Sequence, residues 1–175
     1  MNNLQKLFMD YKGKATTLIE TGTYNGVGVS CAIKAGYDKV ISFEIVKEVQ
    51  DKNIEKFKNH DNITLITASS SSNEFKELVL SLNESCVFWL DAHKMCPNGI
   101  IPDDYPLIEE LRAISKSKFS HTVLMDDYRL FPRYDVYMDD VKKYLTKEGI
   151  DYIITREAIR EKYPKDVLCF NQKEN

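Results

Sequence analysis

The chain has 175 residues, of which 43% are hydrophobic and 29% are charged, and its formal net charge is −3. This balance is typical of one globular domain, which we place at residues 1–175, and it excludes a disordered or fibrous chain. The net negative charge, without a basic block, provides no general attraction to nucleic acid or anionic membranes. No apolar run approaches the roughly 20 residues that cross a bilayer. The first residues lack the apolar segment of a signal peptide, so we expect a cytoplasmic protein.

Short apolar runs bounded by turn residues recur along the chain and predict β-strands. The segments between them have helical length, and several carry apolar residues at helical spacing. Such an alternation predicts an α/β fold in three layers, a doubly wound and mostly parallel sheet with helices on both faces. In chain order we predict strand Thr17–Thr21, helix Gly26–Ala35, strand Lys39–Phe43, helix Val46–Lys58, strand Ile63–Thr67, helix Ser72–Leu82, strand Cys86–Leu90, helix Pro106–Ser115, strand Thr122–Met125, helix Tyr134–Leu145, and strands Asp151–Thr155 and Asp166–Phe170.

A glycine-rich turn follows the first predicted strand. The strand carries Glu20 near its end, the turn contains Gly22 and Gly26, and the second strand is followed by Glu44. Glycine lets the backbone approach a ligand closely, and the start of the next helix offers free N–H groups. A carboxylate at the tip of the second strand can accept hydrogen bonds from both hydroxyls of a ribose. The pattern predicts a nucleoside site; the alternative is an ordinary turn of an α/β protein.

The E-x-G-x-x-x-G turn, followed by an acid roughly twenty residues later, resembles the S-adenosylmethionine site of class I methyltransferases. The resemblance implies a Rossmann-like sheet of about seven strands with a reversed C-terminal strand. It also implies that Glu44 holds the ribose, while Glu20, Gly22 and Gly26 shape the pocket for the methionine part. The other residues that we expect at the cofactor are Thr23, Tyr24, Ile45, Ser69 and Asp91. The run Ser69–Ser72 is expected primarily to cap the next helix, and contact of Ser69 or Ser70 with the adenine is the lesser expectation.

Three carboxylates follow the fourth and fifth predicted strands. Asp91 comes directly after the fourth strand, and Asp126 and Asp127 come directly after the fifth. Ligands of open α/β sheets bind outside the carboxyl ends of the strands, so these side chains should meet beside the cofactor. Clustered carboxylates repel one another unless a cation or protons neutralise them, and hard oxygen ligands suit Mg²⁺. Alternatively, Arg129 and Arg133 balance the carboxylates; these arginines are also candidates for contacting an anionic substrate.

This set of acids resembles the metal site of the macrocin-type O-methyltransferases, which methylate sugar hydroxyls. In that family an Asp after the fourth strand and an Asp-Asp pair after the fifth bind the metal, and Asp91, Asp126 and Asp127 match these positions. The family often has an Asp as general base two residues past the first ligand, where this chain has His93. A neutral histidine can accept a proton near pH 7. We therefore predict His93 and Asp91 as catalytic residues, with a structural role for His93 as the alternative.

The sequence thus predicts an S-adenosylmethionine-dependent, Mg²⁺-assisted O-methyltransferase that acts on a hydroxyl of a small molecule or sugar. The alternatives are a nucleoside-binding or regulatory module without catalysis, and a Rossmann-like enzyme that acts on a nucleotide sugar. The expected partners are the substrate and a second copy of the chain in a homodimer, with no nucleic acid and no membrane. The loop at residues 93–102 lies beside the predicted site and is expected to carry substrate specificity.

Overall fold

The computed structural model describes residues 1–92, 105–148 and 150–172. The predicted base His93 and the whole predicted specificity loop, residues 93–102, lie outside these residues. None of the helices in the described ranges has the length and apolar character needed to cross a membrane. The elements in chain order are α1 (Asn3–Asp10), β1 (Thr17–Thr21), α2 (Val27–Lys34), β2 (Lys39–Glu44), α3 (Lys47–Phe57), β3 (Ile63–Thr67), α4 (Asn73–Ser81), β4 (Val87–Leu90), α5 (Leu107–Ile114), β5 (Thr122–Met125), the 3₁₀ helix η1 (Tyr128–Tyr134), α6 (Met138–Leu145), β6 (Tyr152–Glu157) and β7 (Val167–Gln172).

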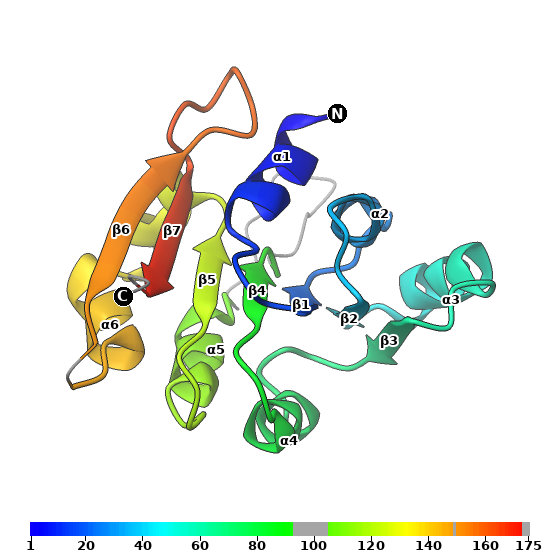
Figure 1. Ribbon diagram of the computed structural model, residues 1–175, viewed down its shortest axis with the longest axis horizontal. Helices are drawn as coiled ribbons and strands as arrows, with labels where there is room; N and C mark the ends of the chain where they lie inside the picture. The colour runs from blue at the N-terminus through cyan, green and yellow to red at the C-terminus, as the bar shows by residue number, and fades with distance from the viewer. Residues whose placement is uncertain (93–104, 149, 173–175) are drawn as a thin grey trace.

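The strands form one sheet in the order β3-β2-β1-β4-β5-β7-β6 (Figure 1). Strands β1 to β5 pair in parallel, whereas β7 is antiparallel to both of its neighbours, β5 and β6. The predicted α/β fold with a reversed C-terminal strand is therefore confirmed. Thr21 of β1 pairs with Phe43 and Leu90, and Leu90 pairs with Met125. The residues that follow β1, β2, β4 and β5 consequently lie at one edge of the sheet.

Helices cover both faces of the sheet and bury two apolar cores (Figure 1). The core with α4, α5 and α6 contains Phe75, Leu111 and Val141, and the core with α1, α2 and α3 contains Phe8 and Val29. Helix α1, eight residues long and placed before the first strand, was not predicted. Its Asn2 cap accepts a hydrogen bond from the Gln5 amide. The three-layer arrangement leaves the carboxyl edge of the strands available for a site.

The predicted helix over residues 134–145 is wrong in its first part. Tyr134 ends η1, and α6 begins only at Met138. Asp135 between them has φ 53°, a left-handed conformation that interrupts a right-handed helix. The 3₁₀ helix η1 starts at Tyr128 and contains Pro132, which has no backbone N–H to donate within a helix.

Helix α3 buries two polar residues beside the apolar Phe57. Gln50 and Asn53 are buried, whereas Val46 and Ile54 are exposed. The Gln50 side-chain amide donates to the carbonyl oxygens of Ser42 and Ile66, at 3.2 and 3.1 Å. Polar groups can be buried when they are hydrogen-bonded in this way. Hydrogen bonds to backbone carbonyls of the sheet therefore satisfy the buried Gln50 amide on this helix face.

Candidate active site

The turn between β1 and α2 has the backbone conformation that its glycines allow. Gly22 has φ +86°, and a Cβ atom there would lie 2.5 Å from the backbone oxygen of Asp91. Gly26 caps α2 at φ +72°, and a Cβ there would approach the Asn53 side chain to 2.6 Å. Both positions exclude other residues by space as well as by backbone angle. The predicted glycine turn is thus present, and it crosses the end of the neighbouring strand β4.

Glu20 lies under this turn and is buried. Its Oε2 accepts a hydrogen bond from the Ser42 hydroxyl at 2.5 Å. Gly28 of α2 leaves room for the other oxygen, because a Cβ there would lie 1.7 Å from Glu20 Oε1. Burial raises the pKa of Glu20 to about 8, with smaller contributions from the charges of Asp91 and Glu44 and an opposing one from Ser42. Glu20 therefore supports the floor of the site and carries a proton near neutral pH.

Glu44 sits at the tip of β2, where the sequence predicts it. Its two carboxylate oxygens accept hydrogen bonds from the amides of Tyr24 and Val46, at 2.9 and 3.0 Å. These contacts fix the carboxylate against the glycine turn. Each oxygen has a second lone pair that remains able to accept a hydrogen bond. The geometry therefore suits an acceptor for two neighbouring hydroxyl groups.

The other predicted cofactor residues surround this turn. Thr23 is buried, and its hydroxyl forms a 2.6 Å hydrogen bond with Ser42. Tyr24 and Ile45 are exposed, at 60% and 65%, and offer apolar surface beside Glu44. The hydroxyl of Ser69 bonds to Ser71 within its own turn, and the α4 cap is Ser72, which accepts from the Phe75 amide. The helix-capping role of this serine run is confirmed.

Asn53 is a supporting residue that the sequence analysis missed. Its side-chain amide donates to the Tyr24 carbonyl at 2.7 Å and to the Val49 carbonyl at 3.1 Å. It therefore ties α3 to the glycine turn. Tyr24 itself has φ 44°, an uncommon angle for a residue with a side chain. The signal in the sequence was a pair of polar residues, Gln50 and Asn53, at helical spacing between apolar ones.

The three predicted metal ligands meet at the ends of β4 and β5. Asp91, Asp126 and Asp127 each offer one carboxylate oxygen, and these atoms lie within 4.8 Å of one another. Asp126 and Asp127 are buried. Burial raises the pKa of Asp126, the charges of Asp91 and Asp127 raise it further, and the Arg160 guanidinium opposes them. The convergence of the three carboxylates is confirmed, and it concentrates negative charge beside Gly22.

Two arginines neutralise part of this charge. Arg160, between β6 and β7, donates to Asp126 Oδ2 at 2.5 Å and to Asp127 Oδ1 at 3.0 Å. Arg129 contacts Asp127 and also Asp166, whose other oxygen accepts from the Arg129 amide at 2.9 Å. The alternative that the two arginines balance the carboxylates is therefore borne out for Arg129, whereas Arg133 is exposed. Arg160 and Asp166 were missed, because a loop more than thirty residues further along the chain gives no local signal.

The carboxylate cluster fits a divalent cation in its donor chemistry. Three hard oxygen ligands within reach of one another are what Mg²⁺ prefers, with water or substrate oxygens completing the coordination. Arg160 uses the same oxygens of Asp126 and Asp127. A cation at this place would therefore have to compete with the guanidinium group.

Glu110 of α5 is a further buried acid near the site. It is 1% exposed, and burial raises its pKa to about 7, an effect that the Asp91 charge reinforces and that Ser70 and Thr21 oppose. Within the described residues, neither Glu110 Oε1 nor the Thr21 hydroxyl has a well-formed hydrogen bond. Glu110 was not predicted, although it lies three residues after Leu107 and four before Ile114, at the spacing of the buried helix face.

The strand order, the reversed β7 and the glycine turn after β1 define the class I methyltransferase fold. Solved structures share it along nearly the whole chain. A candidate methyltransferase of Streptococcus mutans, SMU.1697c, in complex with S-adenosylhomocysteine (SAH), has a TM-score of 0.66 and 13% identity, with 99% of each chain covered.

Two further solved structures belong to named methyltransferases. The N-methyltransferase NodS of Bradyrhizobium japonicum has a TM-score of 0.61 and 10% identity, covering 98% of this chain and 94% of its own. The ribosomal protein L11 methylase of Lactobacillus delbrueckii subsp. bulgaricus has a TM-score of 0.58 and 15% identity, covering 98% and 77%. At such identities the likeness shows the fold alone.

No family model matches the sequence, and no curated protein matches it either. The macrocin-type subgroup that the acids resemble is therefore not supported by any of the comparisons.

Proposed function

We propose that this chain is an S-adenosylmethionine-dependent methyltransferase that transfers a methyl group to a hydroxyl oxygen of a small molecule or sugar. The observation that carries the proposal is the position of Glu44. Its carboxylate is held at the tip of β2, opposite a glycine turn at which Gly22 and Gly26 exclude side chains. This combination of a close backbone approach and a fixed double acceptor suits a ribose. The structure of SMU.1697c with SAH, which shares the fold, supports this choice of ligand.

Oxygen is the proposed acceptor because of the three aspartates beside the turn. Asp91, Asp126 and Asp127 would hold Mg²⁺, which lowers the pKa of a bound hydroxyl and aligns it when present. Without a cation their negative charge would oppose the loss of a proton from a substrate oxygen, so in this proposal the three aspartates serve to hold the cation beside that oxygen. His93, outside the described residues, is the side chain proposed to accept that proton. NodS, which shares the fold, is an N-methyltransferase, so the acceptor atom is part of the proposal.

Isothermal titration with SAH and with NAD tests the proposed cofactor. We expect SAH to bind and NAD not to bind. Glu44→Ala should weaken the binding of SAH at least about tenfold, since hydrogen bonds to a charged group contribute about 1.5–3 kcal/mol. Glu48→Ala, an exposed acid in the first turn of α3, is the matched control and should leave the affinity unchanged.

The same titration can contradict the proposal. Binding of NAD without SAH would favour a nucleotide-sugar enzyme, and binding of neither would leave a regulatory module. If SAH binds, transfer of a labelled methyl group to hydroxylated acceptors and to their amine analogues distinguishes O-methylation from N-methylation. A homodimer and a cytoplasmic location remain proposals, which the mass in solution and the location of the tagged protein would test.

A further inference from the structure

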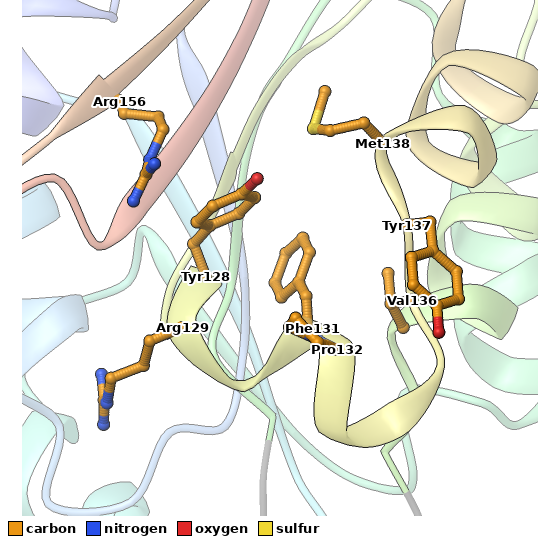
Figure 2. Close-up of a pocket in the computed structure, with 8 residues that line it drawn as sticks. All are labelled: Tyr128, Arg129, Phe131, Pro132, Val136, Tyr137, Met138 and Arg156. Atoms are coloured by element: carbon orange, nitrogen blue, oxygen red, sulfur yellow. The ribbon is translucent and has the colours of Figure 1, made fainter.

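A cavity of about 320 Å³ lies next to the carboxylate cluster, between η1, the start of α6 and strand β6 (Figure 2). One of its lining residues, Tyr128, directly follows the candidate metal ligand Asp127 in the sequence. The volume is at the lower end of that of small-molecule sites, which fits a single ring with its substituents. The lining residues are Tyr128, Arg129, Phe131, Pro132, Val136, Tyr137, Met138 and Arg156.

The cavity has an aromatic and apolar wall with positive charge at one end. The rings of Tyr128 and Phe131 lie 5.1 Å apart, and Figure 2 shows Met138 and Val136 across from Phe131. The Arg156 guanidinium lies over the Tyr128 ring, 4.2 Å from its centroid. Among the residues that the structure describes, the lining contains two arginines and no carboxylate. A ligand with an apolar ring and a negative charge complements such a surface.

The two arginines are not equally available to a ligand. Arg129 is engaged with Asp127 and Asp166, and in Figure 2 it extends away from Phe131. Arg156 uses only its Nε, which donates to the Lys165 carbonyl at 2.9 Å. Across the part of the chain that the structure describes, no group accepts a hydrogen bond from its two terminal nitrogens. These nitrogens form a planar pair of donors that matches the two oxygens of a carboxylate.

From these observations we infer that the cavity binds a small planar ligand with a carboxylate group, the carboxylate against Arg156 and the ring against Tyr128, Phe131 and Met138. Under the proposed methyl transfer this ligand is the methyl acceptor, so its role rests on that proposal, whereas the binding itself does not. The Tyr128 ring and the Lys165 carbonyl hold the guanidinium in place before the ligand arrives, which lowers the entropic cost of binding. Arg156 is therefore the residue that determines specificity for an acid.

Benzoate is the probe for this site, with benzamide as its uncharged analogue and phenyl phosphate as the alternative anion. Affinities are measured by NMR without cofactor, following the Met138 methyl signal, which the aromatic ring would shift. We expect benzoate to bind at least about tenfold more tightly than benzamide, the usual gain of a charged hydrogen-bonded pair. Arg156→Gln should remove this difference, and Arg156→Lys should restore part of it. Lys142→Gln, an exposed lysine of α6 outside the cavity lining, should change nothing.

Several results would overturn the inference. They are equal binding of benzoate and benzamide, an unchanged benzoate affinity in Arg156→Gln, tighter binding of phenyl phosphate than of benzoate, and a shift confined to residues away from Met138. An SAH titration on the same samples separates the two proposals. If SAH binds and benzoate does not, only the inference that the cavity binds a carboxylate ligand is contradicted. If benzoate binds and SAH does not, only the role of that ligand as methyl acceptor is contradicted.

Discussion

Glu110 is an acid whose surroundings oppose its charge. It is buried between α5 and the sheet, and one of its oxygens lacks a well-formed hydrogen bond in the described residues. Its pKa rises from the ordinary 4.5 to about 7. Between these two values the unfolded chain releases the proton while the folded chain keeps it, so stability decreases as the pH rises through this range. Below pH 4.5 both states are protonated and the effect vanishes.

Glu110→Gln should therefore stabilise the protein at pH 7.5 and not at pH 4. An amide has the same shape and no charge to bury, so we expect Tm to rise by about 2–4 °C at pH 7.5, the change that ~1 kcal/mol produces at this chain length. Thermal unfolding monitored by circular dichroism at both pH values measures it. Glu109→Gln, on the exposed side of the same helix turn, is the control. An equal gain at both pH values would contradict the assignment to the carboxyl charge.

The segment between β6 and β7 connects two parts of the site. Arg160 reaches from it to Asp126 and Asp127, and Asp166 holds Arg129 from its other end. Strand β7 lies between β5 and β6 and is antiparallel to both, so β6 ends at the same edge of the sheet as β5. The segment that follows β6 therefore lies at the carboxyl edge. The guanidinium groups act as counter-charges for carboxylates that would otherwise repel one another. The same contacts mean that a metal ion and Arg160 compete for the aspartates.

Arg160→Met should make the stability more dependent on Mg²⁺. Without metal the variant should melt below the wild type, since two buried carboxylates lose a partner. With Mg²⁺ in excess its Tm should rise by more than that of the wild type, because the ion binds the folded cluster without competition. Differential scanning fluorimetry in EDTA and in a Mg²⁺ series measures both effects. Arg133→Met is the control. If the Tm of Arg160→Met does not change with Mg²⁺, the proposed metal site is contradicted.

Helix α1, near the beginning of the chain, packs against the centre of the sheet. The ring of Phe8 packs edge-on against Trp89 of the central strand β4, with centroids 5.5 Å apart, and both side chains are almost fully buried. At the other side of α1, the Tyr11 hydroxyl bonds to Thr155 and Glu157 of the edge strand β6. The helix therefore spans from the middle of the sheet to its edge and completes one of the two cores.

Phe8→Ala should destabilise the whole domain in one transition. The loss of a buried aromatic ring costs about 3–5 kcal/mol, and Trp89 would be exposed to water in a partly empty core. Met9→Ala, on the exposed side of the same helix, should change stability by less than about 0.5 kcal/mol. Urea unfolding followed by the fluorescence of the single tryptophan compares them. Local fraying, with Trp89 fluorescence lost before the ellipticity, would show instead that α1 is dispensable for the sheet.

The sequence by itself determined the fold class and the edge of the sheet at which the site lies. Strands β1, β3 and β5 begin and end where their apolar runs predict, because short runs between turn residues report burial directly. The glycine turn, Glu44 and the convergence of Asp91 with Asp126 and Asp127 also followed from sequence position. In a parallel sheet, the residues after each strand lie at one common edge.

Only the tertiary structure decided which groups support and neutralise that site. Arg160 and Glu110 are distant in sequence from the residues that they approach, and Asn53 lies on a helix whose buried side is polar. The periodicity of apolar residues predicts which side chains are buried, but it does not predict which backbone carbonyl or carboxylate lies opposite them. These partners depend on the strand order and on the packing of helices on the sheet, which arise from contacts between distant parts of the chain.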